Sequence, residues 1–170
     1  RILHAYTCFW GAHYLAWAPF AGIRVDGRDR ARQAGACIFV SNHQSMVDIL
    51  AVFAIRLPFL WVSKVENFYV PFLGWNMWLN DYVALTRGDP KSIEAMMQEC
   101  RVHLRKGSSI MMFPEGTRSL DGEIKAFKHG AFTLASELGI ETVPIVVDGT
   151  RARRDVLAGG RELGWSQRTS

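Results

Sequence analysis

Residues 36–48, ACIFVSNHQSMVD, join a continuous apolar run to a short polar turn. The run lies between Gly35 and the polar pair Ser41 and Asn42, which is typical of a buried β-strand. Residues 45–55 then place apolar side chains on one helical face, so the turn leads directly into a predicted helix. A strand that passes through a turn into a helix is the repeating unit of α/β proteins.

The same alternation continues along the chain. Short apolar runs predict strands at 59–63, 82–86, 109–113 and 143–148, and a brief alternating stretch predicts one at 22–27. Helices are predicted at 69–79, interrupted by a loop, from Asp89 to Gly107, and at 127–138. The sequence therefore predicts an α/β fold, with a mostly parallel or mixed sheet flanked by helices.

Length and composition limit the class of protein. The 170 residues predict one domain, and a hydrophobic fraction of 49% excludes intrinsic disorder. The three cysteines are odd in number and far apart, which excludes a disulfide framework and indicates a reducing compartment. The net charge of +4 is uneven, because residues 1–32 and 151–170 each carry +3 whereas 33–150 carry −2. Basic ends favour nucleic acid or an anionic lipid surface.

The N-terminal segment favours lipid. Residues 2–23 contain no Asp, Glu, Lys or Arg, and they include six aromatic residues: Tyr6, Phe9, Trp10, Tyr14, Trp17 and Phe20. Because Trp and Tyr rings prefer the headgroup level, we expect residues 1–21 to form an amphipathic, aromatic-rich helix at a membrane interface. A bilayer-spanning helix and a helix buried in the protein core remain open. Residues 22–150 form the predicted domain, and 151–170 form a basic tail without periodicity, typical of poor order.

His43 and Asp48 stand where the first of these strands ends and its helix begins. Ligands gather at the carboxyl ends of strands in α/β folds, and an imidazole there can take a proton from an alcohol. A carboxylate can hold the other ring nitrogen and stabilise the imidazolium. The pair resembles a serine-hydrolase triad without its serine, which suggests acyl transfer to a hydroxyl that the substrate supplies. On spacing alone, a helix cap with an acidic first turn remains open.

A second polar turn, FPEGTRS at 113–119, follows another predicted strand. Proline and glycine bracket Glu115, so the backbone turns sharply there. The planar guanidinium of Arg118 suits a phosphate group. Further hydroxyl donors and cations lie nearby in the sequence, at Thr117, Ser119, Lys125 and Lys128. A polar turn with an internal pair between Glu115 and Arg118 remains open.

Together these segments resemble the PlsC-type glycerolipid acyltransferases, the family of 1-acylglycerol-3-phosphate O-acyltransferases. Four blocks match in order: NHQS with Asp48, the stretch from Lys64 through Pro71 and Gly74 to Arg87, FPEGTRS at 113–119, and VPI at 143–145. The stretch FKHGAF at 127–132 is also similar, and the resemblance covers about residues 22–150. Family domains usually continue past the fourth block with further strands, so the short tail hints at a fragment.

The resemblance implies a role for each matching residue. His43 is the implied general base, and Asp48 orients it. Arg87 and Arg118 are implied to hold the phosphate of the acceptor, with Glu115 on a glycerol hydroxyl or on the guanidinium of Arg118. The other implied substrate-binding residues are Lys64, Gly116, Thr117, Lys128 and Pro144.

The resemblance also implies the substrates. An acyl-CoA or an acyl-carrier protein donates the acyl group, a lysophospholipid accepts it, and no cofactor takes part. A metal site is not expected either, because the other four histidines show no ligand spacing with His43. The default acceptor is 1-acylglycerol 3-phosphate, which gives phosphatidic acid. Another lysophospholipid, a lyso-ornithine lipid, glycerol 3-phosphate, a hydrolase activity and a non-catalytic lipid-binding homologue remain open. The expected partners are membrane phospholipids rather than nucleic acid, at the cytoplasmic face of an inner membrane.

Overall fold

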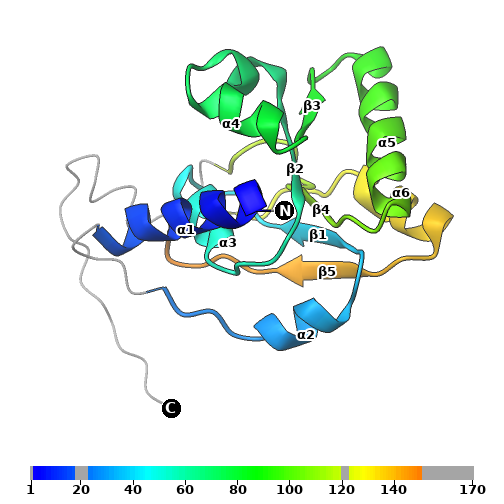
Figure 1. Ribbon diagram of the computed structural model, residues 1–170. Helices are drawn as coiled ribbons and strands as arrows, with labels where there is room; N and C mark the ends of the chain where they lie inside the picture. The colour runs from blue at the N-terminus through cyan, green and yellow to red at the C-terminus, as the bar shows by residue number, and fades with distance from the viewer. Residues whose placement is uncertain (1, 18–22, 120–122, 151–170) are drawn as a thin grey trace.

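The computed structural model describes residues 2–17, 23–119 and 123–150 (Figure 1). In chain order the elements are α1 (Ile2–Trp17), α2 (Arg28–Gln33), β1 (Ile38–Ser41), α3 (Val47–Phe53), β2 (Leu60–Lys64), the 3₁₀ helix η1 (Val65–Tyr69), α4 (Leu73–Leu79), β3 (Val83–Leu85), α5 (Pro90–Arg105), β4 (Ile110–Met112), α6 (Gly130–Leu138) and β5 (Thr142–Ile145). The predicted tail at 151–170 and the end of the predicted membrane helix at 18–21 lie outside the described residues.

The strands form one five-stranded sheet in the order β3-β2-β4-β1-β5. Every pair of neighbouring strands is parallel. Parallel neighbours need crossover connections, and the helices between the strands supply them. The prediction of an α/β fold with a sheet flanked by helices is confirmed. The sequence left a mostly parallel and a mixed sheet open, and the observed sheet is parallel.

Helices cover both faces of this sheet. On β1, Phe39 points into a core shared with α1 and α3, whereas Ile38 and Val40 point into a core shared with α5 and α6. On β4, Met111 and Ile110 divide between the two cores in the same way. Because both faces are buried, these strands are continuous apolar runs without a polar alternation.

Three expected elements differ in the structure. The strand expected at 22–27 is absent from its described residues, 23–27, since Ile23 and Val25 pair with no other strand and Gly27 precedes α2. Helix α3 begins at Val47, after the turn that holds His43. Helix α6 begins at Gly130 instead of residue 127, because the backbone N–H of Lys128 donates to the carbonyl of Pro114 and keeps this segment at the second polar turn.

Helix α1 presents small residues to the protein and rings to the outside. Cys8 is buried, and Gly11 approaches Phe53 of α3 so closely that a Cβ would lie 2.9 Å from its ring. Tyr6, Phe9 and Trp10 are exposed. Among the described residues, no helix combines the length and hydropathy needed to cross a membrane. Contact of α1 with a membrane interface stays a prediction.

The buried cysteines give a prediction for the intact fold. Burial raises the pKa of the Cys8 thiol to about 11 and that of Cys100 to about 12, and it also raises the pKa of Cys37. Because the thiolate is the reactive form, fewer than about one thiol in a hundred is ionised at pH 8 for Cys8 and Cys100. We expect DTNB to label no cysteine in the native protein within minutes and all three in urea. Native labelling at the rate of a free cysteine would contradict this packing.

Candidate active site

The carboxyl ends of β1 and β4 bring the two polar turns of the sequence together. Strand β1 ends at Ser41 and β4 ends at Met112, and the two strands are parallel neighbours (Figure 1). The turn at 42–46 and the turn at 113–119 therefore leave the sheet at the same edge. This juxtaposition follows from the parallel order, since no local sequence signal pairs β1 with β4.

His43 and Asp48 meet in a buried pair. Nδ1 of His43 lies 3.0 Å from Oδ2 of Asp48, and Asp48 is completely buried. Since a carboxylate can only accept, this hydrogen bond places a proton on Nδ1 and leaves the lone pair of Nε2 available to a substrate. Within the described residues, no other group hydrogen-bonds the His43 ring.

Asp48 accepts hydrogen bonds from three donors besides His43. Oδ2 accepts the backbone N–H of Gln44 at 2.6 Å and that of Ser45 at 2.8 Å, and Oδ1 accepts the hydroxyl of Thr150. Burial would raise the pKa of Asp48, but the hydrogen bonds from His43 and the three other donors outweigh it and hold the pKa below its ordinary value. Asp48 is therefore a fixed negative charge at neutral pH, able to stabilise a protonated imidazole.

Phe113 fixes the plane of the His43 ring. The two rings are stacked, with centroids 4.0 Å apart and planes inclined by 11°. Trp61 of β2 packs against Phe113 with ring centroids 5.3 Å apart. With stacking on one face and Asp48 at Nδ1, the direction of Nε2 is set before a substrate arrives.

Glu115 locks the two polar turns together. Its buried carboxylate accepts the backbone N–H of His43 at Oε1, 2.8 Å away, and that of Lys125 at Oε2, 3.0 Å away. The N–H of Ser119 completes the link by donating to the carbonyl of His43 at 2.8 Å. Both oxygens of Glu115 are thus engaged with the backbone, and Glu115 and Arg118 form no ion pair with each other in the described part of the chain.

This lock predicts the effect of Glu115→Gln. The amide would set an NH₂ group against one of the two backbone N–H donors and leave that donor buried and unpaired. We expect a loss of about 1–3 kcal/mol in the free energy of unfolding, measured by urea titration. Glu141→Gln, at an exposed carboxylate, is the matched control and should change stability by less than about 0.5 kcal/mol. Equal stability of the Glu115 variant and the control would contradict the lock.

Cationic side chains surround Gly116 at the mouth of the second turn. Gly116 has a φ of 68°, a conformation that favours glycine, and Nζ of Lys128 lies over it, 2.8 Å from where a Cβ would be. Nζ of Lys125 lies 3.5 Å from the carbonyl of Arg118. The guanidinium of Arg118 is exposed beside the exposed Thr117 and forms no ion pair with a described residue.

The remaining predicted site residues belong to three other strands, with Lys64 and Arg87 at the ends of the neighbours β2 and β3 and Pro144 within β5 at the opposite edge of the sheet. Lys64 ends β2, and its Nζ lies 2.6 Å from Oε1 of Glu66. Arg87, just beyond β3, is exposed and acts electrostatically on the same Glu66. Pro144 is exposed in the edge strand β5 opposite Val40, where a proline is tolerated for structural reasons alone.

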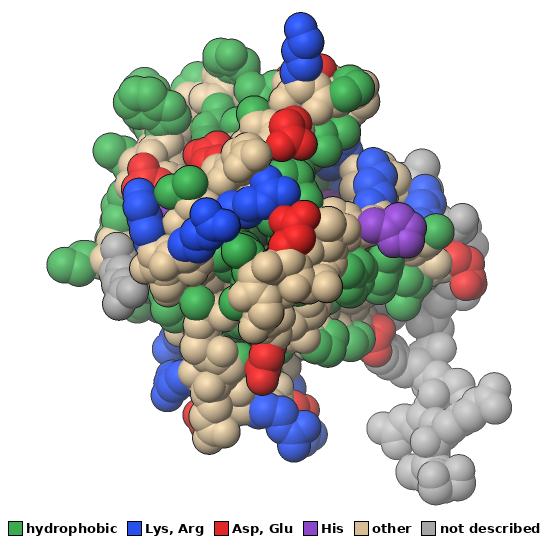
Figure 2. Space-filling model, turned by 90° about the vertical axis from the view of Figure 1, so that its right-hand side faces the viewer, with side chains coloured by type: hydrophobic (Ala, Val, Ile, Leu, Met, Phe, Trp, Pro, Cys, Tyr) green, Lys and Arg blue, Asp and Glu red, His purple; other side chains and the backbone are tan. Residues whose placement is uncertain are grey.

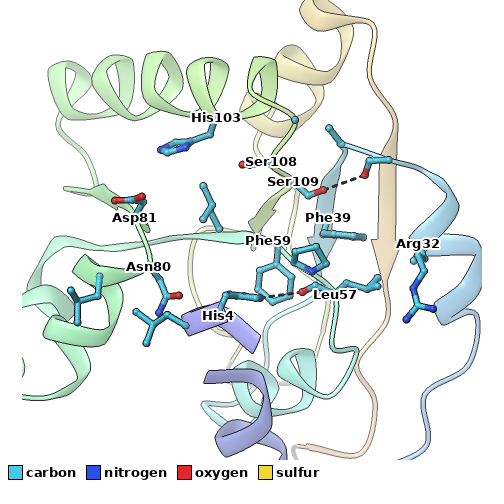
Figure 3. Close-up of a pocket in the computed structure, with 18 residues that line it drawn as sticks. His4, Arg32, Phe39, Leu57, Phe59, Asn80, Asp81, His103, Ser108 and Ser109 are labelled. Carbon is cyan, nitrogen blue, oxygen red and sulfur yellow. Dashed lines mark hydrogen bonds between the residues drawn. The ribbon is translucent and has the colours of Figure 1, made fainter. Parts of the chain in front are cut away.

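A separate cavity of about 440 Å³ lies at the amino ends of the strands, away from His43 (Figure 3). The His4 ring is bonded to the carbonyl of Leu57 at 3.1 Å and to the hydroxyl of Tyr82 at 3.0 Å. The Ser109 hydroxyl donates to the carbonyl of Gly35 at 3.3 Å. These polar groups serve the fold, and no predicted site residue lines the cavity. In the part of the chain that the structure describes, no three His, Cys, Asp or Glu side chains are grouped as metal ligands would be.

The sequence did not identify three contributors to the site. Phe113 and Thr150 contact His43 and Asp48, as described. The Asn42 side chain pairs with the backbone of Val147 in both directions, at 2.8 Å and 2.9 Å, and so fixes the turn after β1 to the segment after β5. These contacts join positions 70 to 105 residues apart, and no spacing rule reaches that far. They follow from the sheet order, which sets β1 between β4 and β5.

Comparison with known proteins agrees with this arrangement. The acyltransferase family matches residues 22–148 of the chain, a range that contains both polar turns. A 1-acyl-sn-glycerol-3-phosphate acyltransferase of Chlamydomonas reinhardtii is 41% identical over 134 residues, covering 78% of this chain and 40% of the relative. The protein of that name from Escherichia coli K12 is 33% identical over 137 residues, covering 78% of this chain and 56% of the relative.

A solved structure gives the same result. The 1-acyl-sn-glycerophosphate acyltransferase PlsC from Thermotoga maritima has a TM-score of 0.76 and 26% sequence identity, covering 88% of this chain and 59% of that one. The chain spans about half the length of the curated relatives it matches. The family match, the identity of the relatives and the shared fold agree, and the chain therefore belongs to the PlsC-type acyltransferase family.

Proposed function

We propose that this protein transfers a fatty acyl group from a thioester donor to the free hydroxyl of 1-acylglycerol 3-phosphate. The observation that carries the proposal is the buried pair of His43 and Asp48, with Nε2 available to a substrate hydroxyl. The relatives named above are 1-acyl-sn-glycerol-3-phosphate acyltransferases, which supports the choice of acceptor.

The proposed reaction needs no protein nucleophile. Nε2 of His43 takes the proton of the acceptor hydroxyl as its oxygen attacks the carbonyl carbon of the thioester. The negative charge of Asp48 stabilises the imidazolium that forms. The tetrahedral intermediate then collapses, the C–S bond breaks, and the proton on Nε2 passes to the departing thiolate. The products are an ester and a free thiol, with His43 returned to its starting state.

The cations at the sheet edge suit the phosphate of the acceptor. Arg118 offers a planar fork of N–H donors, and the Lys128 amino group lies over the same turn. We assign the phosphate to these two side chains, with Lys64 and Arg87 adding positive potential from neighbouring strands. Glu115 supports this site by holding the turns rather than by touching the acceptor.

Other predicted site residues take lesser roles. The backbone of Gly116 and the hydroxyl of Thr117 lie at the mouth of the turn and add donors for the phosphate, whereas Pro144 shapes the edge of β5. The donor is acyl-CoA or acyl-carrier protein, since either presents the same thioester. Both substrates are amphiphiles, so we place the enzyme at a membrane surface, on the cytoplasmic side, with α1 in contact with lipid.

Thiol release and product analysis test the phosphate assignment. With oleoyl-CoA as donor, we expect thiol release to be much faster with 1-acylglycerol 3-phosphate than with the matching monoacylglycerol, which lacks the phosphate. Arg118→Gln should raise KM for the phosphate-bearing acceptor and leave KM for monoacylglycerol unchanged. Equal rates of thiol release with both acceptors would contradict the assignment of the phosphate to Arg118 and Lys128. Free fatty acid as the main product would identify a hydrolase instead.

A further inference from the structure

The segment around α4 gathers several exposed apolar side chains in one short stretch of the chain. Residues 67–80, NFYVPFLGWNMWLN, contain no charged residue. Six of their side chains are 48–79% exposed, and we call them the α4 surface: Tyr69, Phe72, Leu73, Trp75, Trp78 and Leu79. By contrast, basic and acidic side chains are interspersed over the face shown in Figure 2.

Helix α4 is fixed in the orientation that exposes this surface. Its polar side chains point toward α1, where the Asn76 amide donates to the Thr7 hydroxyl at 2.9 Å and the Asn80 amide lies 3.3 Å from the same hydroxyl. Met77 is buried in the core. A helix on a soluble protein turns its polar side to water, whereas this helix uses polar side chains to attach to α1 and turns aromatic ones outward.

The backbone at Phe72 is strained to hold this arrangement. Phe72 has a φ of 63° and a ψ of −48°, and the N–H of Leu73 donates to the carbonyl of Pro71 at 2.7 Å. This is a γ-turn with positive φ, a rare and strained conformation. It is unfavourable for a bulky residue and accessible to glycine. The phenyl ring is 78% exposed and contacts Trp75 edge to face at 5.2 Å. Strain of this kind clusters at functional positions, and here it presents a ring to the outside.

We propose that the α4 surface rests in the headgroup interface of a lipid bilayer. Trp and Tyr with Phe and Leu, without charge, form the composition that this interface prefers. The surface adjoins α1, whose exposed Tyr6 and Trp10 add two more rings. The charged residues of this part of the chain lie at its borders, with Lys64 paired to Glu66 on one side and Asp81 and Arg87 on the other, so the surface itself stays uncharged. An acidic protein partner would need basic side chains on the surface itself, and it has none.

This proposal goes beyond the proposed reaction, because it concerns residues outside the His43 site and is tested by binding alone. Flotation of the whole chain with vesicles of equal parts phosphatidylcholine and phosphatidylglycerol measures the affinity. We expect the double variant Trp75→Gln, Trp78→Gln to bind about tenfold or more weakly than the parent. Replacement of both residues by Phe should restore most of the binding. Val102→Gln on α5, also at an exposed apolar side chain, is the matched control and should bind like the parent.

Phe72→Gly separates membrane contact from folding. Glycine relieves the γ-turn, so the urea midpoint should stay equal or rise while vesicle binding falls. Unchanged vesicle binding by the tryptophan double variant would overturn the proposal. Light scattering gives a second test. If the parent is a dimer, the double variant is a monomer and both bind vesicles equally, the surface is an interface between two copies and the proposal is overturned.

Discussion

His43→Ala is expected to lower kcat for acyl transfer by about 10²–10⁴-fold, the usual contribution of a general base. Nδ1 of His43 is hydrogen-bonded to Asp48, and one face of the ring stacks on Phe113. The other ring nitrogen, Nε2, therefore remains for the acceptor. Alanine keeps the backbone N–H that Glu115 accepts, and the turn should stay in place. The expected loss is therefore in kcat, with KM for both substrates nearly unchanged.

The control for this variant is another histidine. His103 lies on α5, at the cavity on the far edge of the sheet, and His103→Ala should leave kcat near the parent value. Steady-state thiol release and a urea titration of both variants separate catalysis from folding. A His43→Ala protein that is folded and retains more than a tenth of the parent kcat would exclude His43 as the base.

Asp48→Asn is expected to lower kcat by on the order of 10³-fold or more, as loss of the carboxylate does in hydrolase triads. The amide of Asn can donate to Nδ1, which would move the ring proton to Nε2 and leave no lone pair there for the acceptor. The backbone donors of Gln44 and Ser45 would lose their charged acceptor as well. A variant with full activity would contradict the assigned tautomer.

The same variant predicts a change in acid stability. The pKa of Asp48 is lower in the folded protein than in the unfolded chain, so its contribution to stability is present above the unfolded pKa of about 3.9 and is lost as the pH falls through the folded value. At pH 7 we expect the free energy of unfolding to be higher for the parent than for Asp48→Asn. This difference between the two proteins should become smaller below about pH 4. Urea titrations over this range measure it, and a gap independent of pH would contradict the lowered pKa.

The sequence predicted the parts of this protein whose signals are local. The apolar run at 36–40 and the cap of Asp89 and Pro90 each depend on neighbouring residues only, and the structure has a strand and a helix there, with the Asp89 side chain accepting the N–H of Lys91. The strand expected at 22–27 was wrong, because alternation predicts a strand only where another strand is available to pair with it.

The site was predictable as a set of residues rather than as a network. His43 and Asp48 lie five positions apart, and their pairing followed from the chemistry of imidazole and carboxylate. The role of Glu115 as a link between two turns did not, since its partners are the backbone N–H groups of His43 and Lys125. Every residue carries such a group, so composition and motif hold no sign of it. The exposed orientation of α4 likewise depends on where Asn76 meets Thr7.

Mass spectrometry of the lipid product tests the central claim most directly. The protein is mixed with 1-acylglycerol 3-phosphate and oleoyl-CoA, or with oleoyl-acyl-carrier protein, beside a His43→Ala sample. We predict a diacylglycerol 3-phosphate that carries one oleoyl group from the donor, formed by the parent and reduced at least about a hundredfold in the variant. Equal amounts of this product from parent and variant, or none from the parent with either donor, would contradict the account.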